Sequence, residues 1–319
     1  MKRLLAGLAL GFALMNVCTA QSYPTRTIRF IAPFAAGGGT DLIARKLAQK
    51  LTEALGQTVV VDNRTGGSGV IGTDLAAKAP ADGYTIMIAT PTLTVNPSLI
   101  KNLPYDALQD FAPVSLIATS PHLLAVHRSV PAKTVKELVA LAKARRGELT
   151  YSSGSTGGSS HLSGELFNST AGITMVHVPY RGTGEAVLAI MSGEVSLGFN
   201  DVPTTLPHIS SGRLRGIAVT SLKRSPAVPE LPAIAESGYP GFQSGVWYGV
   251  LAPARTRPEI IARLNAELVK IVRTPEFTQG LAAEGAVPVA SSPESFGDFI
   301  KTETVRWAKI IKSANIASN

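Results

Sequence analysis

The chain of 319 residues has 45% apolar and 16% charged side chains and a formal net charge of +8. This balance excludes a largely disordered chain, and the length favours two ordinary α/β domains over a single core. The basic residues form no block interleaved with aromatic side chains, which argues against a nucleic-acid partner and leaves either anionic solutes or a generally basic surface as explanations.

The first twenty residues have the pattern of a secretory signal peptide. Two basic residues precede the apolar run 4–15, and small residues lead up to Ala20. The run is shorter than the roughly 20 apolar residues that a membrane span needs. We therefore predict that residues 1–20 are a signal peptide, cleaved after about Ala20. Cleavage would also remove Cys18, the one cysteine of the sequence, and with it any disulfide or Cys-ligated metal.

Strands, glycine-containing loops and amphipathic helices alternate in the next segment. The predicted elements are strand 28–32, a helix over about 43–55, strand 58–61, a helix over 71–79 and strand 84–89. Such alternation predicts a doubly wound, mainly parallel sheet with helices on its faces. The proline-containing segment 90–113 that follows is expected to be irregular.

A long extended stretch, 114–126, is interpreted as a crossover into a second series of the same kind. The predicted elements of that series are helix 135–145, strand 149–152, helix 160–171, strand 175–178, helix 184–191 and strands 195–199 and 214–221. Strand 246–251 is the predicted return crossover. Two amphipathic helices, around Leu264 and Trp307, complete the chain and are expected to pack on the first lobe.

This pattern predicts an α/β protein of two lobes, each a doubly wound, mainly parallel sheet, joined by two crossover strands. The expected division is 21–122 for the first part of lobe 1, 123–246 for lobe 2, and 247–319 for the return strand and C-terminal helices of lobe 1. Two strands between two lobes are the geometry of a hinge.

Three strand-to-helix loops are rich in Gly, Ser and Thr, namely 35–41, 154–160 and 181–184. Each would present unpaired backbone N–H groups at a helix start, which attracts anions. In an open parallel sheet these loops lie at the carboxyl ends of the strands, where ligands bind. For any one loop, the alternative is that the glycines only form a tight turn before a helix. Three such loops in one alternating series of strands and helices favour a ligand-binding site. None of them matches a P-loop or dinucleotide fingerprint, so no cofactor is predicted.

The predicted ligand-binding residues come from these loops and from the end of strand 195–199. They are Phe34, Ala35, Ala36, Gly37, Gly38, Gly39, Thr40, Asp41, Ser155, Thr156, Gly157, Ser159, Ser160, His161, Tyr180, Arg181, Gly182 and Asp201. Arg181 could pair with a ligand carboxylate or be an exposed loop residue. Asp41 could meet the ligand, although complementing a helix dipole is the preferred role.

Catalysis is poorly supported by the sequence, and no catalytic residue is predicted. Ser160 and His161 are adjacent on a helix and so do not face each other, and no G-x-S-x-G elbow occurs. The five histidines show no paired i, i+4 spacing, so no metal site is predicted.

Six ordered motifs make the chain similar to the Bug receptor family. They are IRFIAPFAAGGGTD, VVVDNRTGGSGVIGTDLAAKAPADGYT, YSSGSTGGSSHLSGELF, HVPYRGTGEA, LPHISSGRLRGIAVTS and WYGVLAPA. This resemblance covers essentially the whole chain after residue 20. It implies a two-lobed periplasmic-binding-protein (flytrap) fold, a periplasmic location, small carboxylate ligands, and water-bridged backbone contacts from 34–39.

The sequence departs from the family pattern at two places. Ala35 and Ala36 replace a common Pro-Pro before the glycines, which removes two fixed φ angles. The usual Phe-Asp-Asn is Phe199-Asn200-Asp201 here, and a shift of one place moves the acid to the other side of a strand. The identity of the ligand is therefore not inferred from the family resemblance at Asp201.

The function expected from all this is a monomeric receptor that captures a mono-, di- or tricarboxylate for the membrane subunits of a tripartite tricarboxylate-type transporter. Two alternatives are a carboxylate sensor that feeds a signalling protein, and a secreted hydrolase that uses Ser160, His161 or Asp201. The transport receptor is favoured over the sensor, and the hydrolase is the least supported of the three functions.

Overall fold

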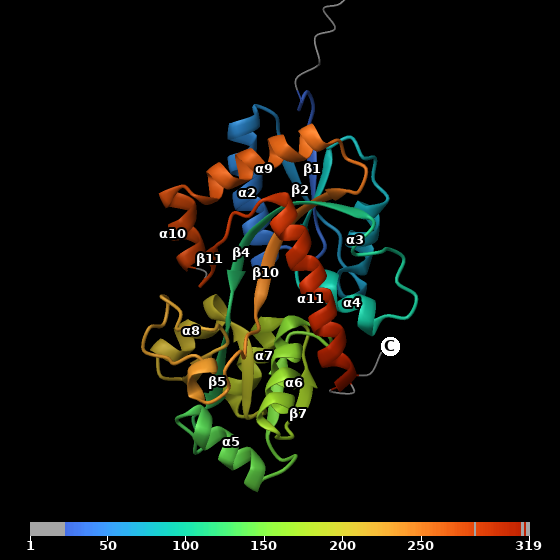
Figure 1. Cartoon of the computed structure of the whole chain (residues 1–319). Helices are drawn as coiled ribbons and strands as arrows, with labels where there is room; N and C mark the ends of the chain where they lie inside the picture. Colours follow the sequence, from blue (N-terminus) through green and yellow to red (C-terminus); the bar gives the residue numbers. More distant parts are fainter. Residues whose placement is uncertain (1–22, 284, 314–315, 317–319) are drawn as a thin grey trace, which may run out of the picture.

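The computed structural model describes residues 23–283, 285–313 and 316 and shows two α/β lobes, one above the other (Figure 1). The predicted signal peptide, 1–20, lies outside the described residues. Among the helices within the described ranges, none is long and apolar enough to cross a membrane. The predicted two-lobed α/β fold is confirmed.

The first lobe is built on a six-stranded sheet in the order β11-β4-β10-β3-β1-β2. One face carries α2, α9 and α10, which pack around residues such as Leu47 and Leu264. The other face carries α3, α4 and α11 around Phe296. The elements are β1 (Ile28–Ala32), α2 (Gly39–Leu55), β2 (Val59–Asn63), α3 (Val70–Ala77), β3 (Thr85–Ala89), α4 (Thr92–Leu99), β4 (Phe111–Ser120), β10 (Val246–Pro253), α9 (Pro258–Val272), α10 (Pro275–Ala283), β11 (Val287–Pro288) and α11 (Pro293–Ser313).

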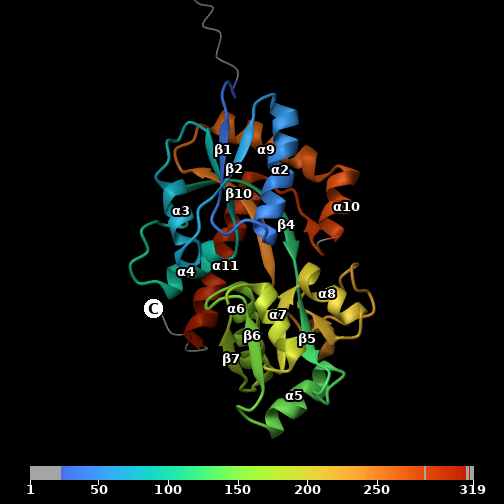
Figure 2. The same cartoon turned by 180° about the vertical axis from the view of Figure 1, so that it is seen from behind.

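The second lobe, at the bottom of Figure 2, is built on a five-stranded sheet. Its strand order is β7-β6-β8-β5-β9. Helices α5 and α6 cover one face around Phe167, and α7 and α8 cover the other around Val187 and Val202. The elements are β5 (His122–His127), α5 (Val135–Ala144), β6 (Thr150–Ser153), α6 (Ser159–Ala171), β7 (Val176–Pro179), α7 (Thr183–Ser192), β8 (Leu197–Asp201), α8 (Val202–Ser210) and β9 (Leu214–Val219).

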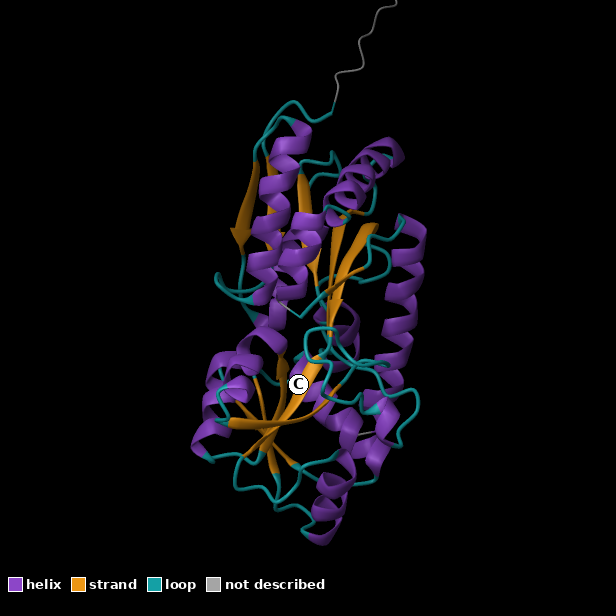
Figure 3. Ribbon diagram, turned by 90° about the vertical axis from the view of Figure 1, so that its left-hand side faces the viewer, coloured by secondary structure: helices purple, strands orange, loops and turns teal. Residues whose placement is uncertain are grey.

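Strand direction follows from the way the chain passes between the lobes (Figure 3). Strands β1, β2 and β3 pair in parallel, as do β6, β7 and β8. Strands β10 and β5 run antiparallel to both of their neighbours. The parallel strands end toward the opposite lobe, whereas β5 and β10 begin there, so they must run the other way. Each sheet is therefore mixed: most of its strands run in one direction, and a crossover strand inside it runs in the other. In lobe 1 the short edge strand β11 is also antiparallel to its neighbour β4.

Two chain segments, lying side by side, connect the lobes. One passes from β4 through Pro121 into β5, and the other leads through Gly245 into β10, where Val246 pairs with Ser120. A Cβ atom on Gly245 would lie 2.3 Å from the Ser120 carbonyl oxygen, and φ at this residue is 149°. Glycine therefore allows the two connections to approach each other.

Thr220, just after β9, ties both connections together. Its hydroxyl accepts a hydrogen bond from the His122 backbone N–H at 2.7 Å and donates one to the Ser244 carbonyl at 2.8 Å. Because Thr220 is fully buried, these bonds are shielded from water and fix the spacing of the two connections.

The lobes also touch on both sides of the gap between them. On one side Gly285 of lobe 1 packs so closely on Val202 of lobe 2 that an added Cβ would lie 2.4 Å from the Val202 Cβ. On the other side Leu99 packs with Leu162 in one buried cluster and lies against Gly157. The two lobes are therefore in contact with each other on two sides of the gap between them.

Three features differ from the sequence expectation. Segment 90–113 is not wholly irregular because it contains α4, and α8 and α10 form where no helix was expected. Pro97 lies within α4 and Pro207 within α8, and prolines mask a helical pattern. Helix α11 does not pack on lobe 1 alone, since Trp307 and Ile311 at its end share a cluster with Leu162 of lobe 2 (Figures 1 and 2).

Candidate functional site

A cavity of about 330 Å³ lies between the lobes, at the carboxyl ends of β1, β3, β6, β7 and β8. It falls within the range of about 300–1,000 Å³ typical of small-molecule sites. The cavity is lined by Phe34, Ala35, Ala36, Gly38, Gly39, Thr40, Thr90, Pro91, Thr92, Gly154, Ser155, Gly158, Ser159, Ser160, Gly182, Thr183, Asp201, Val246 and Tyr248. This lining contains no Lys or Arg in the part of the chain that the structure describes.

Three helices begin at this cavity with a glycine as the N-cap residue. Gly38 precedes α2, Gly158 precedes α6 and Gly182 precedes α7, and none of the three helix starts has a side-chain cap. Away from the cavity, α3 and α9 also lack a side-chain cap, whereas in α5 Thr134 accepts a hydrogen bond from the Glu137 N–H. The starts of α2, α6 and α7 differ from those of α3 and α9 in that they meet at one cavity. The first-turn N–H groups of α2, α6 and α7 therefore remain available to an anion, on the positive side of each helix dipole.

Two of the glycines in these loops also permit close contact. A Cβ on Gly39 would lie 3.0 Å from the Tyr248 hydroxyl, and a Cβ on Gly154 would lie 2.9 Å from the Thr183 backbone nitrogen. Gly154 further accepts a hydrogen bond from the Gly182 N–H at 2.8 Å. Small residues thus bring the loops of lobe 2 together and bring α2 up to the return strand.

Asp41 holds the loop between β1 and α2 in place through hydrogen bonds. Its carboxylate accepts hydrogen bonds from the Gly37 N–H, the Arg45 guanidinium and the Asn63 amide, each at 2.9 Å. The Asn63 amide also donates to the Phe34 carbonyl at 3.0 Å. Burial alone would raise the pKa of Asp41, but the three donors outweigh it and the pKa lies below its ordinary value. The charge of Asp41 is therefore used to hold the loop.

Asp201 and Ser159 meet at a buried histidine on the lobe 2 side. The His122 Nε2 atom lies 3.4 Å from both the Ser159 hydroxyl and Asp201 Oδ1, and its Nδ1 atom is 2.9 Å from the Ser163 hydroxyl. Asp201 Oδ2 also accepts from the Thr183 hydroxyl at 3.3 Å. His122 thus links the first crossover to the floor of the cavity.

A second group of histidines lies beneath the loop 154–160. His161 and His177 stack with their ring centroids 3.7 Å apart, His161 Nδ1 accepts from the Gly157 N–H at 2.9 Å, and His177 Nε2 is 2.6 Å from the Ser153 hydroxyl. Burial lowers the pKa of His161 to about 3, with the neighbouring His177 contributing, and burial lowers the pKa of His177 to about 4. Both rings are therefore neutral at pH 7 and support the loop as hydrogen-bonding, uncharged groups.

Eleven of the predicted ligand-binding residues line the cavity, and the others lie elsewhere. Those that line the cavity are Phe34, Ala35, Ala36, Gly38, Gly39, Thr40, Ser155, Ser159, Ser160, Gly182 and Asp201. Gly37, Asp41 and His161 instead support the loops through the hydrogen bonds described above. Thr156 and Gly157 line a neighbouring crevice beside Leu99.

Tyr180 and Arg181 take part in local contacts within lobe 2. The Tyr180 hydroxyl donates to Glu194 at 2.8 Å, and the Arg181 backbone N–H donates to Glu185 at 3.1 Å. Arg181 is exposed and is absent from the cavity lining. Of the two roles considered from the sequence, pairing with a ligand carboxylate or lying exposed on a loop, the structure shows the second.

The sequence interpretation missed two parts of the lining. Thr90, Pro91 and Thr92 follow β3, the third parallel strand of lobe 1, and the rule that ligands bind at strand carboxyl ends would have included them. Val246 and Tyr248 belong to the return crossover, and their position beside the cavity depends on the pairing of β10 with β3.

The geometry does not assemble the predicted hydrolase alternative. Ser160 accepts a hydrogen bond from the Gly154 N–H, and no hydrogen bond joins Ser160 to His161 among the residues described. Ser159 does approach His122, but Asp201 lies at the same ring nitrogen as Ser159, whereas a triad acid binds the other nitrogen. No cluster of three or more His, Cys, Asp or Glu residues suited to a metal occurs in the described ranges.

Comparisons with known proteins agree on one family. The chain matches the tripartite tricarboxylate transporter family receptor over residues 43–316. Protein BugT of Bordetella pertussis is 39% identical, over 98% of this chain and 97% of that protein. The structure of R. palustris Rpa4515 with adipate is 38% identical with a TM-score of 0.84, over 92% of this chain and 99% of that one. MatC from Rhodopseudomonas palustris with bound malate is 29% identical with a TM-score of 0.80, over 91% and 100%.

The stacked histidines predict a pH dependence of stability. The pKa of a histidine in the unfolded chain is ~6.5, above the values of about 3 and about 4 in the folded protein. Between these pH values the unfolded state therefore binds more protons than the folded state. The free energy of unfolding should be highest above about pH 7 and should fall as the pH drops from about 6.5 toward about 4. Urea unfolding at a series of pH values measures this slope.

The variant His177→Gln should flatten that slope, and His127→Gln, which changes a histidine bonded to Ser129 at the surface, should leave it unchanged. Equal slopes for the parent protein and His177→Gln would show that the buried pair does not control acid stability.

Proposed function

Because this chain belongs to the tripartite tricarboxylate transporter receptor family, we propose that it captures a small dicarboxylate between its two lobes. Members of this family are periplasmic solute-binding receptors. The observation that carries the proposal is the opposition of uncapped helix starts, with α2 in lobe 1 facing α6 and α7 in lobe 2. A carboxylate at each end of a short ligand would accept hydrogen bonds from a different lobe.

Recognition in this proposal depends on main-chain donors. The cavity lining has no Lys or Arg among the described residues, so the partial charges of N–H groups and helix dipoles supply the attraction. The first-loop residues 34–40, the serines of 154–160 and Gly182 are the proposed contacts. Asp201, already bonded to Thr183, is placed to accept a hydrogen bond from a hydroxyl group on the ligand.

The likeness to known complexes supports the carboxylate class. The similar protein Rpa4515 was solved with adipate, and the similar protein MatC was solved with bound malate. Both ligands carry a carboxylate at each end of a short chain. A cavity of about 330 Å³ accommodates a molecule of that size.

The remaining assignments are part of the same proposal. The mature protein begins after about Ala20 and acts as a monomer. Segments 21–122 and 247–319 move together as lobe 1 against 123–246 as lobe 2. The closed receptor delivers its ligand to membrane subunits of a tripartite transporter. The alternative partner is a signalling protein that reads the same closed form.

Binding of dicarboxylates is the first test. Adipate and malate should raise the melting temperature of the purified mature protein, and ligand at 100 times its Kd should stabilise it by about 2.7 kcal/mol. Adipamide, which lacks both charges, should have no effect, because neutral amides interact weakly with the helix dipoles. Calorimetric titration gives the Kd values. The absence of any shift with a panel of mono-, di- and tricarboxylates would rule out the proposed ligand class.

Closure of the lobes is tested by Gly285→Ala. Its new Cβ would press on Val202 of the other lobe and hold the lobes apart, so the Kd for the dicarboxylate should rise about tenfold. Gly212→Ala is the matched control, because Gly212 has φ of 69°, close to the 65° of Gly285, and has no atom near its added Cβ. If both variants bind equally well, contact across this flank does not contribute to affinity.

Transport separates the two proposed partners. Deletion of the gene should abolish uptake of the radiolabelled dicarboxylate that binds in vitro, and a plasmid copy of the wild-type gene should restore it. Uptake that persists at the wild-type rate in the deletion strain would favour the sensor and contradict the transport role.

A further inference from the structure

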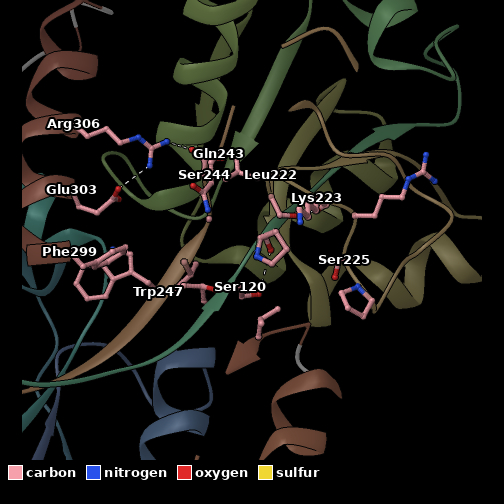
Figure 4. A pocket seen from close by; sticks show the side chains of 18 of the residues that line it. Ser120, Leu222, Lys223, Ser225, Gln243, Ser244, Trp247, Phe299, Glu303 and Arg306 are labelled. Carbon is pink, nitrogen blue, oxygen red and sulfur yellow. Dashed lines mark hydrogen bonds and ion pairs between the residues drawn. The ribbon is translucent and has the colours of Figure 1, made fainter. Parts of the chain in front are cut away.

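A second cavity, of about 370 Å³, is lined by residues of the crossover segments and of both lobes (Figure 4). Successive side chains of a strand point to opposite faces, and accordingly Tyr248 lines the ligand cavity while Trp247 lines this one. Both connections between the lobes contribute to it, together with the loop 221–226 of lobe 2 and helix α11 of lobe 1. We call it the hinge cavity.

Two polar groups in the wall of the hinge cavity have no partner. The Trp247 Nε1–H and the Ser244 hydroxyl are both buried, and neither makes a hydrogen bond within the described residues. Trp247 is 3% exposed and Ser244 is 8% exposed. Buried polar groups in native proteins are nearly always satisfied, so two orphans among the residues that line one cavity indicate missing partners. Both can donate, and an indole N–H can only donate, so the partner is an acceptor.

The charged side chains around the hinge cavity also favour a ligand with an acceptor group, in particular a negatively charged one. Arg306 is paired with Glu303 and donates to the Gln243 carbonyl, and Arg224 is paired with Glu236. In contrast, no ion pair or side-chain hydrogen bond occurs for the exposed ammonium group of Lys223 within the described parts of the chain. Glu303 also accepts a hydrogen bond from Trp307 Nε1 at 2.9 Å, so both of its carboxylate oxygens have partners. The uncompensated charge at this cavity is therefore the positive charge of Lys223.

The rest of the lining is apolar. Phe299 and the rings of both tryptophans form the side made by lobe 1, and Leu222 and Val287, which are 48% and 45% exposed, lie at the mouth. Exposed apolar side chains beside buried aromatic rings favour a ligand with an apolar body. The acceptor group of that ligand would face Ser244, Trp247 and Lys223.

We propose that the hinge cavity is a second binding site, separate from the dicarboxylate cavity, and that it takes a small aromatic monocarboxylate. The carboxylate pairs with the Lys223 ammonium. Because the Trp247 Nε1–H and the Ser244 hydroxyl are buried, both side chains must turn toward the cavity before the carboxylate oxygens accept from them. The ring packs between Phe299 and Leu222. The site is made from both lobes, so its occupant contacts residues that move relative to one another when the lobes move.

The two tryptophans of the chain, Trp247 and Trp307, both line the hinge cavity, so intrinsic fluorescence reports on it directly. Benzoate is the probe, titrated into the dialysed mature protein, with benzamide as the uncharged analogue of the same shape. We expect a saturable change in tryptophan emission with benzoate and a much weaker one with benzamide.

Two variants and a control decide where benzoate binds. Lys223→Gln should raise the Kd for benzoate roughly tenfold, because it removes the charge that pairs with the carboxylate. Trp247→Phe keeps an aromatic ring but removes the donor, and it should also weaken binding, with Trp307 as the reporter. Lys136→Gln, at an exposed lysine of α5, should bind like the parent protein.

Absence of a saturable change, or an unaltered Kd in Lys223→Gln, would overturn the proposal, and the second result would place benzoate in the other cavity. The experiment does not depend on the proposed function. A protein that fails to bind any dicarboxylate can still bind benzoate at the hinge, and the reverse also holds.

Discussion

Helix starts without side-chain caps are the feature on which the ligand cavity depends. An ordinary helix satisfies its first N–H groups with Ser, Thr, Asp or Asn, as α5 does with Thr134. Glycine at the start of α2, α6 and α7 leaves those groups for a ligand. This arrangement works only because the strands before these helices all end at the gap between the lobes. The antiparallel direction of β5 and β10 is the consequence, since both strands begin at the gap.

Much of this architecture could be predicted from local patterns. Apolar residues at 43, 47 and 51 mark α2, and the glycine loops before α2, α6 and α7 mark where an anion would bind. Local patterns fail where proline hides a helix, as in α4 and α8, and where a contact joins distant segments. His122 reaches Ser159 from 37 positions away, and no periodicity in the sequence reveals such a pair. The same holds for the stacking of His161 on His177.

The two proposed sites would use different physical means to attract an anion. The cavity between the lobes presents main-chain dipoles in a lining without Lys or Arg among the described residues, so in the proposed function it would select a ligand by the shape and spacing of its acceptors. The hinge cavity presents aromatic rings, two buried donors and an ammonium group. They share Val246 and lie on opposite faces of the same strands. Any coupling between their occupants would be reciprocal by thermodynamic necessity.

Helix α11 acts as a strap as well as a part of lobe 1. Its first turns pack around Phe296 in lobe 1, and its last turns, through Trp307 and Ile311, reach Leu162 of lobe 2. In the proposed motion, opening of the lobes would have to separate this end of the helix from α6, and this contact would limit the angular range. A bulky group attached to the last turns of α11 would pull on the same contact and weaken the connection between the lobes.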